Sequence, residues 1–521
     1  MKLTALFRHI SIRSIHYTDD NGIRSTLSAL PNLEVTHITS SSGNVACGSA
    51  FVALRGIKKD GNDYIEEALH NGAKVIITDK IEKALRKVYQ NLGTYVIIEV
   101  ENARCVLSYL CDAINGFPSE KMHFVAVTGT NGKTSVTHML KSIFEAAMFK
   151  CGLIGTLNCY SLGRKLEYTP NDPNASMTTP DPEPLYAMLG EMVKDKVEYV
   201  FLEATSHALA LGRLAPIMFD AAIFTNLTPD HLDFHHTMEN YLDAKLKLFE
   251  RCRLAILNAD DKYYQQIYSS INKNCRVLSC SSHRDIGDYR AEGVSLSGVD
   301  GCEYHLTSKQ SIFRIKSPIP GRFTVMNTLQ ACALALELKI KPAQIFDGIS
   351  GLSVIDGRME RIRLCADVDF SIFIDYAHTP DALESLIETV RSFKKSTQRI
   401  VVLFGCGGDR DKTKRPVMGR IASTLADKII VTSDNPRTED QHQIIADIMS
   451  GVSNTVNCVI IPDRTKAIEY AIRTAVSGDI ILLVGKGHEE YEITPEGKKP
   501  FNEKNIAINA VRKYGEYRSH I

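Results

Sequence analysis

The sequence predicts an α/β protein of three domains, and two patterns carry that prediction. Short apolar, β-branched runs alternate with helical patterns in the C-terminal third, which is typical of a parallel sheet covered by helices on both faces. In the middle of the chain, a glycine-rich turn stands between an apolar run and a helical pattern. A chain of 521 residues has room for about three domains of roughly 150 residues each.

The expected domain limits follow from where these patterns begin and end. Residues 1–118 form a first block with apolar runs such as SAFVAL, and the Phe117-Pro118 pair is the predicted linker. Residues 119–355 are expected to form a central domain on a parallel sheet, and residues 356–521 a doubly wound, Rossmann-like domain.

Composition and charge exclude several classes of function. The 61 basic and 61 acidic side chains give a net charge of +0, which argues against a general nucleic-acid binder. The first residues have no apolar signal region, and no apolar stretch approaches 18 residues, so neither export nor membrane insertion is expected. The 13 cysteines form no CxxC pair, which is typical of a reduced chain. The sequence therefore predicts a cytoplasmic protein.

The C-terminal block is predicted in most detail. Strands are expected at 370–377, 399–405, 428–433, 458–462 and 479–485, with helices at 381–393, 415–426, 440–452 and 464–476. Ligands bind beyond the carboxyl ends of the strands in such a sheet. Polar segments stand at four of these ends: DYAHTPD, GCGGDRDKTKR, TSDNPRTED and VGKGHEEYE. We expect them to form one site. None of them matches a dinucleotide-binding loop.

The central block carries the strongest single motif, a phosphate-binding loop between a strand at 123–128 and a helix. Its glycines let backbone N–H groups point at phosphate oxygens, while Lys133 supplies a positive charge and the Thr134 hydroxyl can ligate Mg²⁺. The sequence therefore predicts ATP binding. The loop residues are Gly129, Thr130, Asn131, Gly132, Lys133, Thr134 and Ser135.

A second group of candidate residues follows the loop. A strand is expected to end in Glu203, another to end in His231, and a helix to open at 241–245 with Lys245. Mg²⁺ prefers oxygen ligands, so Glu203 suits it well and His231 adequately. Two alternatives stay open: His231 and His235 as a zinc pair at i, i+4, or a capping role for His231.

These motifs, with others in the same order, resemble those of the Mur ligases, which build the peptide stem of bacterial peptidoglycan. The motifs that carry the resemblance are TGTNGKT, LEATSH, TNLTPDHLDFH, YLDAKLKLF, LNADD, GRFTVMN, DGRME, IDYAHTPDALE, FGCGGDRDKTKRP, TSDNPRTED and VGKGHEEYE. The resemblance extends over nearly all of the chain. The pairing of DNPR with GKGHE resembles the branch that adds meso-diaminopimelate to the stem.

The resemblance implies an ATP-dependent ligase that joins an acid to an amino acid through an acyl phosphate, with ATP and Mg²⁺ as cofactors. The implied substrates are UDP-N-acetylmuramoyl-L-alanyl-D-glutamate and a diamino acid, and we expect a monomer. Lys245 matches a lysine that the family carbamylates; unmodified, it would be an ordinary exposed helix lysine. The implied metal ligands are Thr134, Glu203, His231 and Lys245, and the further ATP contacts are Asn327, Arg358 and Asp375.

The resemblance also implies where the two other substrates bind. For the muramoyl peptide the matching residues are Ser42, Thr178, Thr179, Thr205 and Arg213. The resemblance implies that residues 1–118 form the domain that binds the UDP-sugar. Ser42 alone matches the Asp-Ser-Arg segment of the family's nucleotide-sugar domain, because Ser41 and Gly43 replace its neighbours. For the amino acid the matching residues are Arg410, Asp434, Asn435, Pro436, Arg437, Gly485 and Glu489.

Arg437 is the predicted reader of diaminopimelate, because its guanidinium can bind the far-end carboxylate that lysine lacks. A salt bridge from Arg437 to Glu439 or Asp440 is the structural alternative. Lysine or ornithine stays open as the amino acid, as does another Mur-type or folylpolyglutamate-type ligase. From other classes, an ATPase that moves a partner and an inactive scaffold remain alternatives. Retention of Lys133, Glu203, His231 and Lys245 disfavours the scaffold.

Overall fold

The computed structural model describes residues 1–22, 24–56, 59–91, 93–168, 178–352, 354–364, 368–453 and 455–518, with side chains described as far as residue 514. The chain forms two compact units. The first comprises Met1–Ala126, Lys150–Asp220 and Lys247–Arg253, and the second comprises Val127–Phe149, Ala221–Leu246 and Leu254–Ile521. The three predicted domain limits remain a prediction.

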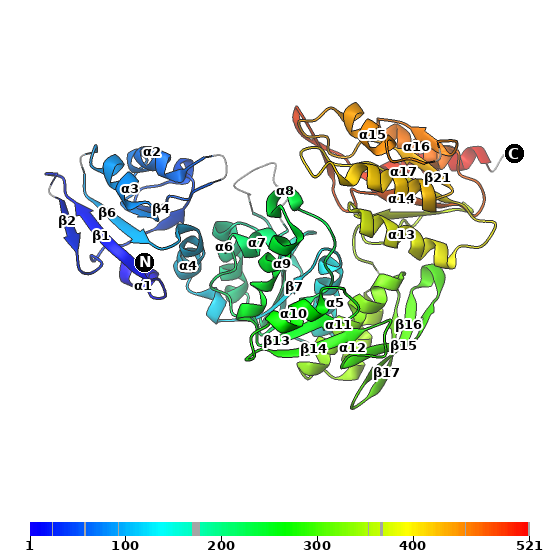
Figure 1. Cartoon of the computed structure of the whole chain (residues 1–521), viewed down its shortest axis with the longest axis horizontal. Coiled ribbons are helices and arrows are strands. Elements are labelled where there is room, and N and C mark those ends of the chain that lie inside the picture. Colours follow the sequence, from blue (N-terminus) through cyan, green and yellow to red (C-terminus); the bar gives the residue numbers. More distant parts are fainter. Residues whose placement is uncertain are drawn as a thin grey trace. The chain divides into compact units, whose positions relative to one another are not determined.

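The N-terminal region is built on a six-stranded sheet (Figure 1). Its elements are α1 (Leu3–Leu6), β1 (Ile12–Thr18), β2 (Arg24–Leu27), β3 (His37–Thr39), β4 (Ser49–Val52), α2 (Ile65–His70), β5 (Val75–Thr78), α3 (Ile81–Val88), β6 (Tyr95–Val100) and α4 (Ala103–Ile114). The strand order is β2-β1-β6-β5-β4-β3, in which β3 to β6 run parallel. Apolar side chains of α2 and α3 pack with Phe51, Ile76 and Ile97 of the sheet, so this region buries a core of its own.

The middle region contains the longest sheet. Its elements are β7 (His123–Thr128), α5 (Lys133–Ala146), β8 (Cys151–Ile154), β9 (Cys159–Ser161), β10 (Arg164–Leu166), α6 (Pro182–Lys194), β11 (Tyr199–Glu203), α7 (Ser206–Ala210), β12 (Ala221–Phe224), α8 (Leu232–His235), α9 (Met238–Leu246), β13 (Leu254–Asn258), α10 (Tyr264–Ser270), β14 (Arg276–Ser281), β15 (Tyr289–Leu296), β16 (Cys302–Ser308), β17 (Ile312–Ser317), α11 (Arg322–Glu337) and α12 (Pro342–Gly351). The strand order is β10-β9-β8-β11-β7-β12-β13-β14-β15-β16-β17. Strands β12 to β15 run parallel, and β16 and β17 complete an antiparallel edge.

Helix α5, which follows the glycine-rich turn, packs closely against α12. The apolar side chains of α5 from Val136 to Phe144 are buried. A side chain on Gly348 of α12 would collide with the backbone of Ile143, and the Ser142 hydroxyl donates to the Gly348 carbonyl at 2.7 Å. This close approach fixes the helix that begins at Lys133.

The C-terminal region is the predicted doubly wound domain. Its elements are β18 (Glu360–Arg361), β19 (Ser371–Asp375), α13 (Pro380–Phe393), β20 (Ile400–Phe404), α14 (Lys414–Leu425), β21 (Lys428–Val431), α15 (Gln441–Met449), β22 (Cys458–Ile460), α16 (Arg464–Arg473), β23 (Ile480–Val484), β24 (Tyr491–Thr494), β25 (Gly497–Pro500) and α17 (Glu503–Arg518). The main sheet has the order β18-β19-β23-β20-β21-β22. All of its strands except β18 run parallel.

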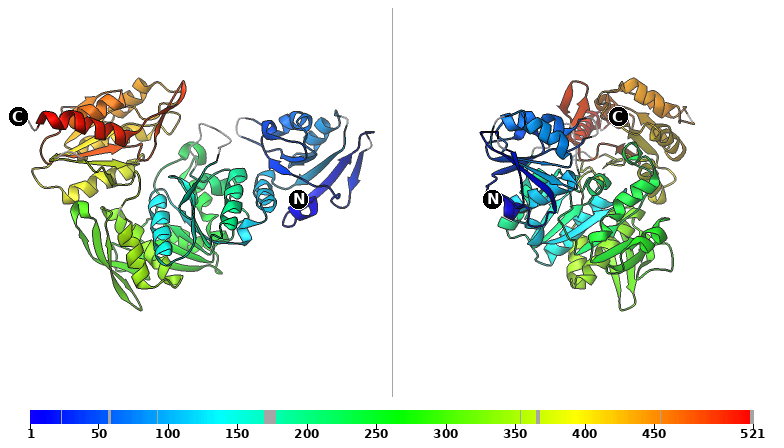
Figure 2. Two further views of the ribbon diagram at one scale, coloured as in Figure 1. Left: turned by 180° about the vertical axis from the view of Figure 1, so that it is seen from behind. Right: turned by 60° about the vertical axis from the view of Figure 1, so that its left-hand side comes forward.

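Both faces of this sheet are buried, which explains its continuous apolar runs. Along β20, Val402 and Phe404 pack with α13, α14 and α15, whereas Val401 and Leu403 pack with α16 and α17. Figures 1 and 2 show these two helical layers on either side of the sheet. The alternating pattern of strands and helices therefore predicted the fold class correctly.

Two expected element boundaries in the middle region are wrong. Strand β12 ends at Phe224, so His231 does not end a strand; Thr225 and Asn226 turn instead to bond the glycine-rich loop. Residues 241–245 lie in the second half of α9 rather than at its start. That helix begins earlier because the Thr237 hydroxyl accepts a hydrogen bond from the Asn240 N–H, as an N-cap does.

Candidate active site

The glycine-rich loop joins β7 to α5, as the sequence predicts. Gly129 and Gly132 adopt φ values of 147° and 86°, which favour glycine. A side chain on Gly132 would lie 2.7 Å from the Asn327 Oδ1, so Asn327 of α11 borders the loop directly. Within the loop, the side chains of Thr130, Thr134 and Ser135 are buried. The loop therefore presents the N-terminus of a 14-residue helix, a ready anion-binding arrangement.

The residues after β12 brace the loop in this conformation. The Asn226 side chain accepts from the Asn131 N–H at 2.9 Å, and the Thr225 hydroxyl donates to the Asn131 carbonyl at 2.6 Å. The Thr130 hydroxyl donates to the Thr228 carbonyl at 3.1 Å. These bonds hold the loop in this shape from within the protein, which reduces the ordering that phosphate binding would require.

Two lysines converge on one carbonyl of the loop. The Nζ of Lys133 donates to the Gly129 carbonyl at 3.0 Å and to the Thr130 carbonyl at 2.8 Å. The Nζ of Lys245, from α9, donates to the same Gly129 carbonyl at 2.8 Å. The structure thus brings together two predicted catalytic lysines that are far apart in sequence.

Lys245 is not an exposed helix lysine, which corrects one alternative from the sequence. Its side chain is only 2% exposed, and its Nζ lies 4.5 Å from the centre of the Tyr241 ring. Burial lowers its pKa well below the ordinary lysine value, and the nearby charge of Lys133 adds to that effect. Lys245 is therefore poised to carry a neutral amine, the form that reacts with electrophiles.

His231 lies beside Asp230 in the same region. The distance between its Nε2 and the Asp230 carboxylate is 3.4 Å, and its backbone is left-handed at φ 54°. Burial lowers the pKa of His231 to about 4, although Asp230 opposes the shift. Burial opposes ionisation of Asp230, but His231, His378 and Lys414 hold its pKa below the usual range. A neutral imidazole beside a carboxylate keeps a nitrogen lone pair available for a metal.

Two residues of the C-terminal region, Arg358 and Asp381, bond the nucleotide loop. Arg358 donates to the Thr134 hydroxyl at 3.1 Å, and its guanidinium lies 4.7 Å from the centre of the Tyr376 ring. The Asn131 amide donates to Asp381 at 3.1 Å. Asp375 accepts from the N–H groups of Met359 and Ala377. Arg358 is thus at the loop, whereas Asp375 organises the backbone next to it.

In the first unit, Glu203 anchors a cluster of threonines. Its carboxylate is 1% exposed and accepts from the Thr156 N–H at 2.8 Å and the Thr156 hydroxyl at 3.0 Å. The Thr156 hydroxyl lies 3.0 Å from that of Thr178. The Thr179 hydroxyl donates to the Glu203 carbonyl at 2.6 Å and lies 3.0 Å from the Thr205 hydroxyl. Four of the predicted residues therefore do form one polar cluster.

Arg213 joins this cluster, whereas Ser42 does not. The Arg213 guanidinium donates to the Thr179 carbonyl at 2.7 Å and pairs with Asp181 at 2.9 Å. The Ser42 hydroxyl donates instead to Glu67 at 3.0 Å, in an exposed position. The predicted link from Lys245 and His231 to Glu203 joins residues of different units and stays a prediction.

The four polar segments of the C-terminal sheet meet at one edge, as predicted. The Asn435 amide donates to Glu489 at 2.7 Å, and the Gly408 N–H donates to the Asn435 carbonyl at 2.9 Å. A side chain on Gly485 would lie 2.7 Å from the Asp434 carboxylate, so the residue that follows β23 must be a glycine. These contacts join the segments that follow β20, β21 and β23. The fourth segment, after β19, joins them through Tyr376, whose ring centre lies 5.2 Å from that of His488.

The Arg437 side chain lies against this cluster, held by backbone carbonyls. It donates to the Gly408 carbonyl at 2.8 Å and to the Asn435 carbonyl at 3.4 Å, and its backbone φ of 52° follows Pro436. The alternative salt bridge to Glu439 is wrong, because Arg415 and Lys412 bind that carboxylate at 3.0 and 3.1 Å. Arg410 lies exposed nearby, donating to the Asp409 carbonyl.

A buried lysine that the sequence did not single out holds the acidic part of this cluster. The Lys486 Nζ, fully buried, donates to the Asn435 side chain at 3.0 Å and the Tyr491 carbonyl at 2.9 Å. It lies 3.6 Å from Asp434 and 4.0 Å from Glu489. Burial opposes ionisation of Asp434, yet Lys486, Arg464 and Arg437 lower its pKa. Burial raises the pKa of Glu489, and Asp434 adds to that shift.

Sequence reasoning thus missed Asp230, His378, Lys486 and Arg464. The first three stand inside motifs that it quoted, so their positions were visible but not their partners. Arg464 begins helix α16, which follows the short strand β22, and this position gave no signal of burial. No helix begins at the GKGHE segment, because β24 follows it.

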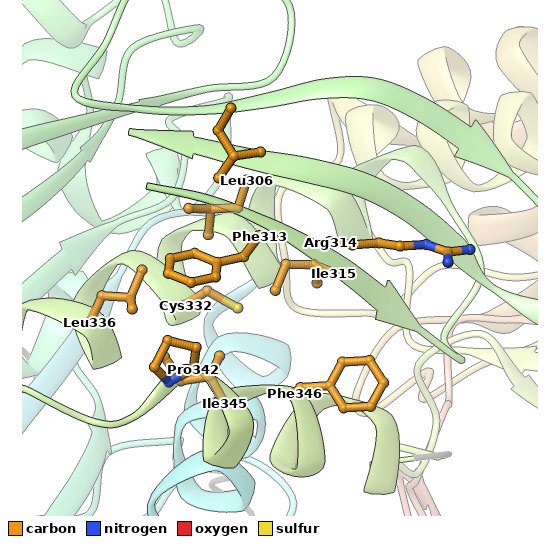
Figure 3. A pocket seen from close by; sticks show the side chains of 10 residues that line it. Leu306, Phe313, Arg314, Ile315, Cys332, Leu336, Pro342, Ile345 and Phe346 are labelled. Atoms are coloured by element: carbon orange, nitrogen blue, oxygen red, sulfur yellow. The ribbon is translucent and has the colours of Figure 1, made fainter. Parts of the chain in front are cut away.

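Three further features of the described residues bear on function. No three His, Cys, Asp or Glu side chains among them come together to hold a metal ion, which leaves the zinc pair of His231 and His235 without support. None of the described helices is long and apolar enough to cross a membrane. An apolar pocket of about 300 Å³ lies between β17, α11 and α12, and Figure 3 shows Phe313, Ile345 and Phe346 around it. It contains none of the predicted site residues.

Each of the three regions matches a known sequence family. Residues 34–113 match the Mur ligase family catalytic domain, residues 127–335 the Mur ligase middle domain, and residues 357–487 the Mur ligase glutamate ligase domain. The chain belongs to the Mur ligase family and is an ATP-dependent amide-forming ligase.

Individual relatives show which members of the family the chain is similar to. A UDP-N-acetylmuramoyl-L-alanyl-D-glutamate--2,6-diaminopimelate ligase of Clostridium acetobutylicum is 37% identical, over 92% of this chain and 96% of the relative. The enzyme of that name from Clostridium tetani is 38% identical over 92% and 96% of the two chains. A solved structure of a ligase with the same name has a TM-score of 0.66 and 29% identity, covering 98% of this chain and all of that one. The MurF ligase of Thermotoga maritima in complex with ADP shares the fold, with a TM-score of 0.60 at 18% identity.

Proposed function

We propose that this ligase joins meso-diaminopimelate to the D-glutamate γ-carboxylate of UDP-N-acetylmuramoyl-L-alanyl-D-glutamate, a step of peptidoglycan synthesis. Relatives with that name match over nine-tenths of the chain. The observation that carries the choice of amino acid is the charged cluster of Asp434, Arg437, Lys486 and Glu489 at one edge of the C-terminal sheet.

The charges of this cluster favour a ligand end that is itself neutral overall. Asp434 and Glu489 supply two acidic groups, and Lys486 and Arg437 supply two basic ones. The far end of diaminopimelate carries one ammonium and one carboxylate, so it adds no net charge to a partly dry site. The far end of lysine or ornithine carries the ammonium alone and would leave Arg437 without a carboxylate partner.

ATP is proposed to bind at the loop of residues 129–135, with its phosphates at the N-terminus of α5. Two anions must meet there, because the γ-phosphoryl group passes to the substrate carboxylate and ADP leaves. Lys133 and Arg358, which both contact the loop, are placed to reduce that repulsion. The amine of the amino acid then attacks the acyl carbon, loses a proton, and displaces phosphate. Asn327 and Asp375 are proposed to border the nucleotide.

Magnesium is proposed to be bound by Thr134, Glu203, His231 and Lys245. Thr134 and Glu203 offer oxygen ligands, and His231 offers a neutral nitrogen because its pKa is lowered. Bound Mg²⁺ would neutralise phosphate charge. Lys245 is proposed to carry a carbamate: its neutral amine would add to CO₂ and lose a proton, giving an anion in place of a cation. That change would relieve the pairing of two lysines on the Gly129 carbonyl.

The threonine cluster of the first unit is proposed to bind the muramoyl peptide. Thr178, Thr179 and Thr205 present neutral hydroxyls, and Arg213 supplies a positive charge for an acidic substrate. Ser42 keeps its proposed role near the nucleotide sugar. A cytoplasmic location and a monomeric state are further parts of this proposal.

Direct competition tests the proposed amino acid. Equal concentrations of meso-diaminopimelate, lysine and ornithine are given to the enzyme with ATP and the muramoyl dipeptide. The products are identified and quantified by mass spectrometry. We expect diaminopimelate product in excess of roughly 10-fold, because a charged hydrogen bond contributes about 1.5–3 kcal/mol. Equal incorporation of lysine would overturn the choice of amino acid. Phosphate release without an acceptor peptide would instead favour the alternative that the protein is an ATPase that moves a partner.

A further inference from the structure

Arg464, the first residue of α16, is buried beneath the loops proposed to hold the amino acid. Its side chain is 1% exposed and that of its partner, Glu503 of α17, is 2% exposed. The Arg464 Nε and Nη2 both donate to the Glu503 Oε1, at 2.9 and 2.7 Å. This ion pair is therefore almost completely withdrawn from water.

The remaining donors of Arg464 go to two backbone carbonyls. Its Nη1 donates to the Ser433 carbonyl at 3.0 Å, and its Nη2 donates to the Val484 carbonyl at 2.9 Å. Ser433 precedes Asp434 directly, and Val484 precedes Gly485 directly. One guanidinium thus joins the strand ends from which both amino-acid loops depart.

The loops that leave these strand ends must keep a close spacing. Asp434 meets the backbone of Gly485 so closely that a side chain there would lie 2.7 Å from its carboxylate, and Asn435 bonds Glu489 at 2.7 Å. No backbone hydrogen bond of the sheet pairs β21 with β23, because β20 lies between them. A direct tie between these two strand ends is instead supplied by the Arg464 side chain, which bonds both the Ser433 and the Val484 carbonyls.

We propose that Arg464 is a positioning residue for the ligation reaction: it sets the spacing of the 434–437 and 485–489 loops, so that the diamino acid meets a preformed set of acidic and basic groups. This rests on the proposed amino-acid site. Its rigid, planar fork carries donors on three separate nitrogens and so reaches Glu503 and two carbonyls at once, whereas a lysine has a single nitrogen. Its positive charge also favours the ionised form of Asp434.

A purely stabilising ion pair is the competing explanation, and a double variant separates the two. Replacing a buried ion pair by apolar residues is often neutral for stability, whereas removing one partner is not. Arg464→Met with Glu503→Leu should therefore keep a melting temperature near that of the wild type. The Ser433 and Val484 carbonyls still lose their donor, so the two strand ends lose this tie although the Asn435–Glu489 bond between the loops remains.

The measurement is KM for the amino acid that the wild-type enzyme joins, together with KM for ATP. We expect the double variant to raise the amino-acid KM roughly 10-fold or more, with ATP KM changed less than about 2-fold. Arg464→Lys, which keeps the charge but not the fork, should give an intermediate KM and serves if the double variant does not fold.

Arg399→Met is the matched control. Arg399 binds buried Asp479 through two hydrogen bonds at 2.9 and 2.8 Å, at the opposite edge of the same sheet. It should lower stability without changing the amino-acid KM. An unchanged amino-acid KM in folded Arg464 variants would overturn the inference. Arg437→Ala is measured alongside: if it also leaves KM unchanged, the proposed amino-acid site itself fails.

Discussion

The nucleotide loop and the amino-acid cluster lie in one unit but are built in different ways. The loop is a continuous run of residues whose shape comes from two glycines and from backbone bonds to Thr225 and Asn226. The cluster collects side chains from three strand ends and depends on buried charges, Lys486 foremost. A site built from backbone is visible in a short motif, whereas a site built from buried charges depends on the packing of distant segments.

The difference has a functional meaning. ATP is recognised through phosphates, which a helix N-terminus and one or two cations can bind. A diamino acid is distinguished from its analogues only by the positions of single charged groups. We therefore expect changes in the loop to act mainly on kcat, and changes in the cluster to act mainly on the KM of the amino acid.

The largest effect is expected for Lys133→Ala. Removing this charge should lower kcat on the order of 10²-fold or more, because the transferring phosphoryl group loses a contact that matters most in the transition state. Phosphate release with all three substrates measures it. Lys141→Ala, on the same helix and paired with Glu145 at 2.8 Å, is the control and should change kcat less than about 2-fold. Near-normal turnover of Lys133→Ala would remove the lysine from the mechanism.

A somewhat smaller effect is expected for Lys245→Ala, since part of it should be reversible. The variant should lose on the order of 10²-fold in kcat, and a short carboxylic acid should restore a fraction by replacing the carbamate. Labelled bicarbonate should give a carbamate carbon signal in the wild type that the variant lacks. Exposed Lys247→Ala is the control. A wild type without that signal would argue that Lys245 acts as an amine.

Arg437→Ala tests the charged cluster. The KM for diaminopimelate should rise roughly 10–100-fold while that for ATP stays nearly constant, because one charged hydrogen-bonding group is lost. Steady-state kinetics with each substrate varied in turn gives both values. Exposed Arg420→Ala on α14 should leave both unchanged. A parallel rise in the ATP KM would show that the two sites are not independent.

The smallest effect concerns pH. Burial lowers the pKa of His138 and of His378 to about 4, so both are neutral in the folded protein. The unfolded chain binds their protons from about pH 6.5 downwards, so the free energy of unfolding falls as pH drops from 6.5 towards 4. At pH 5 we expect a loss of about 1–2 kcal/mol for each histidine, seen as a lower melting temperature.

Substitution identifies the source of that loss. His378→Gln should flatten part of the pH dependence, whereas exposed His305→Gln should leave it unchanged. If His378→Gln melts with the wild-type pH dependence, then His378 is not held neutral by the fold.

Much of the fold and part of the site could be predicted from local patterns. Strand β7 was placed at its exact limits, because an apolar run meets a glycine that must turn. The clustering of the polar segments after β20, β21 and β23 followed from parallel strand order alone. The error at His231 arose because Thr225 and Asn226 bond the nucleotide loop, a long-range contact with no local signal.

The sequence by itself determined the α/β fold class, the phosphate-binding loop and the edge of the C-terminal sheet where charged loops gather, because these depend on periodicity and on consecutive residues. Only the tertiary structure decided the state of individual charges. Lys245 contacts the loop because α9 buries its side chain against Gly129. Arg464 reaches the Ser433 and Val484 carbonyls because α16 and α17 enclose its side chain. Burial and partners set a side chain's charge, and both come from segments that are distant in the sequence.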